Sequence, residues 1–260
     1  MDTIRHRTVI VTGASRGIGK AMAVAFGCEG AHVVVTARTT EAIEEVADRI
    51  RQGGSDALAV TADLSVEADI QRIADAALTG FGQIDILVNN AAIIHPPIDL
   101  VAFETDVWRR VVDVNLTAAA LLIKAALPNM IENRYGKIIN ISSIGGRKGA
   151  RGRSAYRVTK AGLISLTESV AAEVKEYGID VNCICPGWTE TPMSLPFLNE
   201  HPEERRFGEQ IAALGRIARP EEIAKMALFL ASDDSSFMSG AALTADGGWT
   251  AGLTKAVALV

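Results

Sequence analysis

The sequence predicts an α/β fold in which helices cover both faces of a doubly wound, mainly parallel sheet of seven strands. Three observations indicate this fold. Short β-branched runs alternate with longer helical patterns along the 260 residues. The strand cores, such as Val33–Val35 and Ile138–Ile139, are apolar throughout, as in parallel strands buried on both faces. No linker, low-complexity tract or repeat interrupts the alternation, so we expect one domain over residues 1–260.

The seven expected strands are spread evenly along the chain. They are Thr8–Thr12, Ala31–Ala37, Ala57–Ala62, Ile84–Asn89, Gly136–Ser142, Ile179–Cys185 and Ala241–Ala245. Helical patterns fill the gaps: residues 163–174 carry apolar side chains at helical spacing. Pro220 and Glu221 begin a further helix, because proline suits the first turn and acids suit its positive end. The irregular stretch 188–217, rich in Pro, Met, Phe and charge, is a candidate substrate lid.

The bulk composition excludes several classes of protein. The formal net charge of −5 makes nucleic acid an unsuitable partner. Cys28, Cys183 and Cys185 form neither a metal-binding nor a C-x-x-C pattern, so we expect buried thiols in a reducing compartment, the cytoplasm, and no metal site. The N-terminus runs straight into a strand pattern, and the longest apolar stretches are strand-length or broken by charge. We therefore expect neither a signal segment nor a membrane span.

A glycine-rich turn follows the first strand. Gly13, Gly17 and Gly19 have the spacing Gly-x-x-x-Gly-x-Gly, and a helix is expected to begin there. Such a turn lets the backbone approach a pyrophosphate closely and points the free N–H groups of the helix N-terminus at it. The turn therefore predicts a Rossmann-type dinucleotide site, with glycines that serve packing alone as the alternative.

The same turn contains a serine-hydrolase motif. Residues 13–17 match Gly-x-Ser-x-Gly, in which a nucleophile such as Ser15 stands between a strand and a helix. A hydrolase also needs an acid and a histidine downstream and an oxyanion loop from an earlier strand, and the sequence offers no earlier strand. His95 and His201 have no evident partner. Ser15→Ala would inactivate a hydrolase, whereas a reductase would keep its chemistry.

The second strand ends without the acid that an NAD site uses to hold the ribose 2′-hydroxyl. Ala37 and Arg38 stand at that place. Arg38 and Arg16 are suited to clamp a 2′-phosphate, because guanidinium groups bind phosphate bidentately. We therefore expect NADP(H) to be preferred over NAD(H).

Three polar side chains between residues 143 and 160 are suited to proton transfer. Tyr156 and Lys160 lie four positions apart on an expected helix and so share a face, and Ser143 follows a strand-like run. A nearby ammonium favours the phenolate and lowers the pKa of a tyrosine, and Ser143 can donate a hydrogen bond to the same substrate oxygen. The set predicts an acid–base site; a chance spacing around a partly exposed tyrosine is the alternative.

Together these residues resemble the short-chain dehydrogenase/reductase family, and the likeness covers nearly the whole chain. The motifs that carry it are Thr12-Gly-x-x-x-Gly-x-Gly19, Asp63-Leu64, Asn89-Asn90-Ala91-Ala92, Asn115, Ser143, Tyr156-x-x-x-Lys160, Pro186-Gly187 and Asp246-Gly247-Gly248. The resemblance implies an NADP(H)-dependent oxidoreductase that moves hydride between nicotinamide and a small carbonyl or secondary-alcohol substrate. It also implies a homo-oligomer, a dimer or tetramer built through the long helices and the last strand, with the apolar tail Ala256–Val260 as a candidate contact.

The resemblance assigns a role to each matching residue. The implied catalytic set is Asn115, Ser143, Tyr156 and Lys160. The implied cofactor-binding set is Gly13, Ser15, Arg16, Gly17, Ile18, Gly19, Arg38, Thr39, Asp63, Leu64, Asn89, Ala91, Tyr156, Lys160, Pro186, Gly187, Thr189 and Thr191. In the family, the match of Asn115 holds a helix backbone open so that a water links to the lysine. The matches of Asp63 and Leu64 flank the adenine, and the stretch from Pro186 to Thr191 meets the nicotinamide carboxamide.

The substrate-facing wall is expected on three loops. Its candidate residues are Ile94, His95, Pro96, Ile144, Gly145, Arg147, Trp188, Met193 and Phe197. The basic run Arg147–Arg153 is either a solvated loop or an attractor for an anionic substrate or carrier. The likeness is close to the 3-oxoacyl-[acyl-carrier-protein] reductases and includes Arg134, but Tyr177 stands where those enzymes often carry a second basic residue. A general ketone reductase, a carrier-protein reductase and a non-catalytic binding protein remain alternatives, and Arg134→Glu separates the first two.

Overall fold

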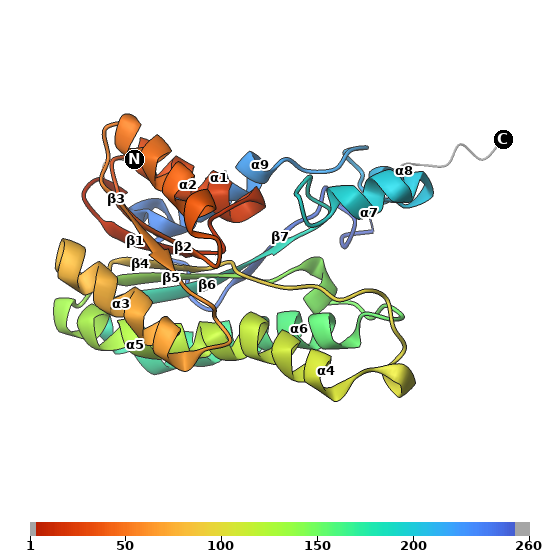
Figure 1. Ribbon diagram of the computed structural model, residues 1–260, viewed down its shortest axis with the longest axis horizontal. Helices are drawn as coiled ribbons and strands as arrows, with labels where there is room; N and C mark the ends of the chain where they lie inside the picture. The colour runs from red at the N-terminus through yellow and green to blue at the C-terminus, as the bar shows by residue number, and fades with distance from the viewer. Residues whose placement is uncertain (1–3, 253–260) are drawn as a thin grey trace.

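The computed structural model describes residues 4–252, and all seven expected strands form within them. They make one sheet in the order β3-β2-β1-β4-β5-β6-β7, and every pairing is parallel (Figure 1). The strands are β1 (Thr8–Thr12), β2 (His32–Ala37), β3 (Ala57–Thr61), β4 (Ile86–Asn89), β5 (Gly136–Ile141), β6 (Ile179–Pro186) and β7 (Ala242–Ala245). The expected fold class is confirmed, and the strand boundaries differ from the expected ones by at most two residues.

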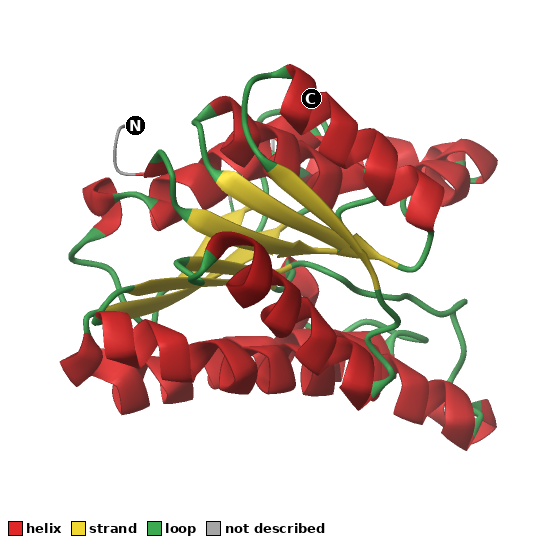
Figure 2. Ribbon diagram, turned by 60° about the vertical axis from the view of Figure 1, so that its left-hand side comes forward, coloured by secondary structure: helices red, strands yellow, loops and turns green. Residues whose placement is uncertain are grey.

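Helices cover both faces of the sheet, as Figure 2 shows. One face carries α1, α2 and α9, and the other carries α3, α4, α5 and α6 (Figure 1). The helices are α1 (Gly17–Cys28), α2 (Thr40–Gln52), α3 (Glu67–Phe81), α4 (Thr105–Val112), α5 (Ala118–Asn133), α6 (Ser154–Val174), α7 (Leu195–Glu200), α8 (Pro202–Ile211) and α9 (Pro220–Ala231). The expected tail contact Ala256–Val260 lies outside the described residues.

Two apolar cores explain why the strands are apolar without interruption. Val9 and Val11 of β1 pack with α1, α2 and α9 on one face of the sheet. Ile10, between them, points to the other face and packs with α3, α5 and α6. Each central strand therefore buries both sets of alternating side chains, which an antiparallel sheet with one wet face does not require.

The helical stretch 105–133 contains an apolar run longer than the strand-length stretches expected from the sequence. It is long and apolar enough to cross a membrane by length and composition alone. Some of its apolar side chains, including Leu122 and Met130, are buried in the core with α3 and α6. A π-helical turn at Asp113–Thr117 joins its two parts, α4 and α5. Such turns commonly mark functional positions in helices.

The strand order reverses direction at β1, which has β2 on one side and β4 on the other. The connection after β1 passes over one face of the sheet and the connection after β4 passes over the other. A crevice therefore opens beyond the carboxyl ends of these two adjacent strands. The expected lid segment, residues 188–217, contains α7 and α8 and extends past that end of the sheet (Figure 1).

Candidate active site

A cavity of about 1060 Å³ lies at the carboxyl ends of the strands. Its lining takes residues from the loops after β1, β2, β3, β4, β5 and β6 and from the lid segment. It contains every residue of the implied cofactor-binding set except Asn89, together with Ser143, Tyr156 and Lys160 of the catalytic set. Residues that are up to 236 positions apart in sequence, from Gly13 to Trp249, are thus brought to one site.

The glycine turn forms the cavity floor at the start of α1. Gly13 and Gly17 have φ values of +64° and +57°, which glycine adopts without strain. A Cβ atom at Gly19 would collide with the carbonyl oxygen of Gly13. The turn is therefore folded tightly on itself, and it leaves the first N–H groups of α1 facing the cavity, as a pyrophosphate site requires.

Asn90 clamps the glycine turn to the loop after β4. Its side-chain amide donates to the carbonyl oxygen of Thr12 over 2.8 Å, and its backbone N–H donates to the Thr12 hydroxyl over 2.9 Å. Asn89, the expected cofactor residue, does not line the cavity. Its amide donates instead to Asn140 of β5 over 2.9 Å. Asn89 thus supports the central sheet beneath the site, and its neighbour Asn90 lines the cavity.

Arginine side chains gather at the end of the cavity formed by the loops after β2 and β3. Arg16 and Arg38 line it as expected, and Arg110 of α4 joins them. Asp63 lines the same end, and Ser65 keeps the pKa of its carboxyl low by hydrogen bonding, with smaller contributions from Arg38 and Arg110. Two guanidinium groups, those of Arg38 and Arg110, beside one carboxylate leave net positive charge where a 2′-phosphate would lie, and Arg16 of the glycine turn lines the same cavity. Arg110 could not be identified from the sequence, because its place on an exposed helix carries no motif.

Tyr156 and Lys160 share one face of α6, as expected, and both reach the cavity. The Lys160 ammonium lies 5.7 Å from the centroid of the Tyr156 ring and donates to the carbonyl oxygen of Ile141 over 2.7 Å. Ser142 ties the end of β5 to α6 by donating to the Lys160 carbonyl oxygen over 2.6 Å. Ser143 accepts a hydrogen bond from the Gly145 N–H over 2.9 Å, which fixes its hydroxyl beside the tyrosine.

The electrostatic environment of Tyr156 combines burial with positive charge. Burial raises the pKa of its phenol, while the hydrogen bond with Ser143 and the charges of Arg157 and Arg153 lower it. Burial also lowers the pKa of Lys160 to about 8. Lys160 was expected to be the cation that lowers the pKa of this phenol, but the charges that do so are those of Arg157 and Arg153. A phenol in such a place can hold its proton at neutral pH and still release it to a developing oxyanion.

Asn115 lies in the π-helical turn and does not line the cavity. Its side chain accepts from the Ile93 N–H over 2.8 Å and donates to the Ile93 carbonyl oxygen over 2.9 Å. It also donates to Thr159, one residue before Lys160, over 3.3 Å. Asn115 therefore fixes the loop after β4 against α6 and acts as a positioning residue for the site.

Most residues of the expected substrate wall line the cavity. Ile94, His95, Pro96, Ile144, Gly145, Trp188, Met193 and Phe197 all line it. The Trp188 and Phe197 rings, both in the lid segment, stack with centroids 6.4 Å apart where they line the cavity. Arg147 is absent from the lining, because its guanidinium donates to the Ala242 carbonyl oxygen of β7 over 2.8 Å.

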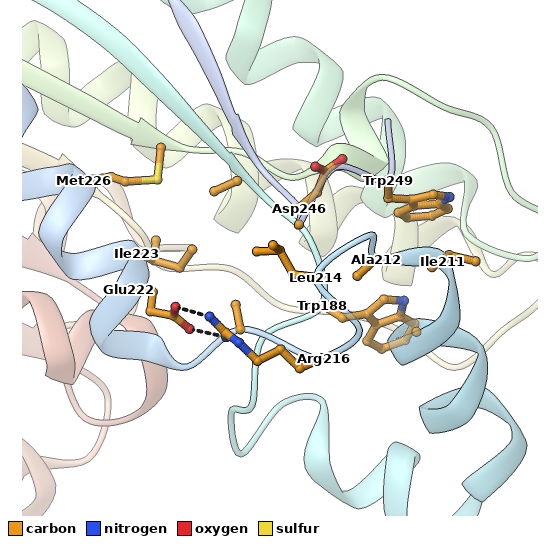
Figure 3. A pocket seen from close by; sticks show the side chains of 14 residues that line it. Trp188, Ile211, Ala212, Leu214, Arg216, Glu222, Ile223, Met226, Asp246 and Trp249 are labelled. Atoms are coloured by element: carbon orange, nitrogen blue, oxygen red, sulfur yellow. Dashed lines mark hydrogen bonds and ion pairs between the residues drawn. The ribbon is translucent and has the colours of Figure 1, made fainter. Parts of the chain in front are cut away.

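A smaller pocket of about 180 Å³ lies between the lid segment and α9 (Figure 3). Trp188 and Trp249 line both this pocket and the main cavity. Across it, Arg216 forms a two-pronged ion pair with Glu222 of α9, with N–O distances of 2.6 and 2.7 Å. The pair ties the end of the lid segment to α9, which packs against α1 and lies over β5 and β6. This limits how far that end can move.

Known proteins resemble this chain over almost its full length. Residues 13–250 match the family model described as Enoyl-(Acyl carrier protein) reductase. The cis-4-hydroxycyclohexanecarboxylate dehydrogenase of Sinomonas cyclohexanicum is 39% identical and covers 96% of this chain and 99% of its own length. The 3beta-hydroxysteroid dehydrogenase 1 of Eggerthella lenta is 38% identical, with coverages of 96% and 95%.

Solved structures agree with the sequence relatives. A short-chain type dehydrogenase/reductase from Mycobacterium marinum superposes with a TM-score of 0.89 at 33% identity and covers 96% of this chain and 98% of its own. A proposed NAD(P)-dependent gluconate 5-dehydrogenase from Beutenbergia cavernae, solved with NADP bound at low occupancy, gives a TM-score of 0.90 at 36% identity. Its coverages are 96% and 98%.

Proposed function

The chain belongs to the short-chain dehydrogenase/reductase family and is an oxidoreductase of that family, and from this premise we propose that it interconverts secondary alcohols and ketones with NADP(H). One observation carries the proposal. A single cavity joins the glycine turn and the arginines at one end to Ser143, Tyr156 and Lys160 at the other. The tight turn at Gly13 and Gly19, which a Cβ atom would fill, fits the pyrophosphate of a dinucleotide.

The side chains of the site divide the reaction between them. When bound, the nicotinamide supplies the hydride that adds to the carbonyl carbon. Tyr156 then donates its phenolic proton to the carbonyl oxygen as negative charge develops there, and Ser143 holds that oxygen by a hydrogen bond. The Lys160 ammonium, below the tyrosine ring, stabilises the phenolate that remains. In alcohol oxidation the same phenolate takes the proton back.

NADP(H) is the proposed cofactor because Arg16, Arg38 and Arg110 surround the adenosine end with no acid in place of Ala37. We expect NADPH to bind about ten-fold or more tightly than NADH, since charge-assisted hydrogen bonds are each worth about 1.5–3 kcal/mol. Titration of both cofactors by fluorescence measures this. Arg38→Ala should remove most of the difference, and Arg49→Ala, an exposed arginine of α2 outside the cavity, should keep it. Equal affinities in the unaltered protein would refute the cofactor preference.

Small secondary alcohols are the proposed substrates. The named relatives act on a hydroxylated cyclohexane ring and on the 3β-hydroxyl group of steroids, and both are secondary alcohols. A carrier-protein substrate is not favoured, because Tyr177 occupies the place of the second basic residue and Arg134 bonds its own chain at Glu176 over 2.8 Å. Reduction of a panel of cyclic and linear ketones with NADPH tests the proposal, and no turnover of any member would contradict it.

We also propose a cytoplasmic homo-oligomer, a tetramer or a dimer. The helical stretch 105–133 supports an assembly, since only 39% of its most apolar window is buried within the chain. Cys183 and Cys185 are buried as expected, whereas Cys28 is exposed, so the expectation of buried thiols is wrong for Cys28. All three cysteines are free, which supports a reducing compartment. Sedimentation of the purified protein would measure its mass, and a monomer at micromolar concentration would contradict the proposed assembly.

A further inference from the structure

Two arginines flank Tyr156 at the start of α6. Arg153 stands at the N-cap position of α6 and Arg157 lies one turn later, so these two side chains share one side of the helix, and Tyr156 lies three residues after Arg153. Both are half-buried and line the cavity. Arg153 donates to the carbonyl oxygen of His95 in the loop after β4, and Arg157 donates to that of Lys148 in the loop after β5. Backbone bonds thus hold both guanidinium groups at the substrate end.

Neither guanidinium group forms an ion pair with a carboxylate of residues 4–252. Arg151, two residues before Arg153, differs in this respect, because its guanidinium forms an ion pair with the Asp99 carboxylate at 2.6 Å. Asp63 is the one acid that lines the cavity within the described chain, and it lies at the opposite end with Arg38 and Arg110. The end of the cavity around Tyr156 is therefore cationic, and no carboxylate that lines the cavity lies at that end.

Such a pair is electrostatically unfavourable without an anion. Burial lowers the pKa of both guanidinium groups, and the charge of Arg157 lowers the pKa of Arg153 further. Two half-buried cations that repel each other would be relieved by a ligand oxyanion placed between the loops that hold them. Arg153 also lies 6.0 Å from the Phe197 ring centroid, which keeps its planar group against the lid segment.

We propose that Arg153 and Arg157 bind a carboxylate carried by the substrate, so that the enzyme acts on hydroxy acids and their oxo acids. This inference rests on the proposed alcohol–ketone chemistry at Tyr156 and specifies its substrate class. His95 adds a polar group at the same end of the cavity. Its Nδ1 lies 2.7 Å from the Pro96 carbonyl oxygen, and its Nε2 is buried with no hydrogen-bond partner among residues 4–252. Because Nδ1 donates to that carbonyl oxygen, the Nε2 of a neutral ring is an acceptor, which suits a water or a substrate hydroxyl group and not the carboxylate itself.

One competing explanation assigns Arg153 to the lid alone. Glu204 of α8 raises the pKa of Arg153 by its charge, although the two side chains do not form an ion pair. If lid anchoring were the whole role of Arg153, removal of the Glu204 charge would have the same effect as removal of the arginine. If Arg153 binds a substrate carboxylate, removal of the Glu204 charge takes away a competing anion and does not weaken carboxylate binding.

The test measures binding of small acids and their uncharged analogues to the protein loaded with NADP⁺. Calorimetric titration compares benzoate, cyclohexanecarboxylate and pentanoate with the corresponding amides. We expect at least one acid to bind on the order of 10- to 100-fold more tightly than its amide, because two charge-assisted contacts are lost in the amide. Arg153→Gln and Arg157→Gln should each reduce that ratio several-fold, and the double variant should bring it close to one.

Arg151→Gln is the matched control, since it removes the same charge from the same segment at a residue that does not line the cavity. It should keep the acid-to-amide ratio, and Glu204→Gln should keep or raise it. Equal binding of acids and amides, or no binding of either, overturns the proposal, as does a Glu204→Gln variant that behaves like Arg153→Gln. NADPH titration of each variant separates this failure from failure of the dinucleotide site, which would abolish NADPH binding in the unaltered protein as well.

Discussion

Tyr156 shows how a single residue acquires its function from its surroundings. Burial alone would hold the phenol protonated and inert, because the charged form is costly in a low dielectric. The Ser143 hydroxyl and the two arginines act in the opposite direction. Lys160, fully buried beneath the ring, adds a cation that the fold must keep out of water. Proton transfer at Tyr156 therefore depends on the buried Lys160 ammonium, a group that lowers the stability of the fold and is held in place by packing.

Replacement of Lys160 by methionine should stabilise the fold and abolish catalysis. Burial lowers the pKa of Lys160 to about 8 from its ordinary value of 10.5. At about 1.4 kcal/mol per pH unit, this is a cost of about 3 kcal/mol, and loss of the hydrogen bond to Ile141 returns about 1 kcal/mol. We expect Lys160→Met to raise the free energy of unfolding by about 2 kcal/mol at pH 7, measured by urea denaturation.

The pH dependence of this gain has a definite sign. Between about pH 8 and 10.5 the unfolded chain binds the Lys160 proton and the folded chain does not, so the stability of the unaltered protein rises with pH in that window. The penalty is complete below pH 8 and vanishes above 10.5. The advantage of Lys160→Met should shrink accordingly, and an advantage that is constant across the window would show that the lysine is not buried as a charge.

At the residue scale, the sequence predicted those residues of the site that belong to a recognisable motif. Ser143, Tyr156 and Lys160 follow from spacing, because helix geometry places residues four apart on one face. Arg157 and Arg110 carry no motif, and only the folded loops decide where their long side chains lie. Asn89 shows the opposite case: its motif is present, but strand alternation turns its side chain into the sheet toward Asn140.

The β1–α1 unit is the element on which cofactor binding depends. In its turn, Gly19 lies against the Gly13 carbonyl oxygen and the Asn90 side chain. These two groups leave no room for an added carbon at Gly19, and the Asn90 side chain is itself held by its hydrogen bond to Thr12 of β1. A change there therefore alters the backbone path itself.

Gly19→Ala should weaken NADPH binding by on the order of 10-fold or more and lower stability by about 1–3 kcal/mol, the usual cost of overpacking. The added Cβ atom meets a backbone oxygen that cannot rotate away. Fluorescence titration and thermal denaturation measure the two effects. Gly149→Ala is the control, because nothing lies within 4 Å of its added Cβ atom. Unchanged NADPH affinity in Gly19→Ala would show that the turn does not hold the pyrophosphate.

At the scale of elements, the strands were predictable and the helical irregularities were not. Continuous apolar runs identify parallel strands because both of their faces are buried. The π-helical turn at Asp113–Thr117 has no such signal, since it depends on Asn115 bonding Ile93 across the loop after β4. The positions of α7 and α8 were likewise not predictable, because they depend on contacts formed only in the folded chain, such as the stack of Phe197 in α7 on Trp188.

The whole molecule brings the two halves of the site together through its topology. Parallel strands place all their carboxyl ends at one edge, and the reversal at β1 opens a crevice between them. The glycine turn comes from the first strand and the acid–base pair from the helix after the fifth. The order of strands, rather than any local interaction, explains why one cavity can hold both a dinucleotide and a substrate.

The most direct test of the central claim is the turnover of Tyr156→Phe with the best ketone of the panel and NADPH. The variant keeps the ring and loses only the hydroxyl that transfers the proton. Because positioned acid–base groups are typically worth 10²–10⁴-fold, we expect kcat to fall by about that factor while NADPH fluorescence still reports binding. A variant that reduces the ketone at the rate of the unaltered protein would contradict the account.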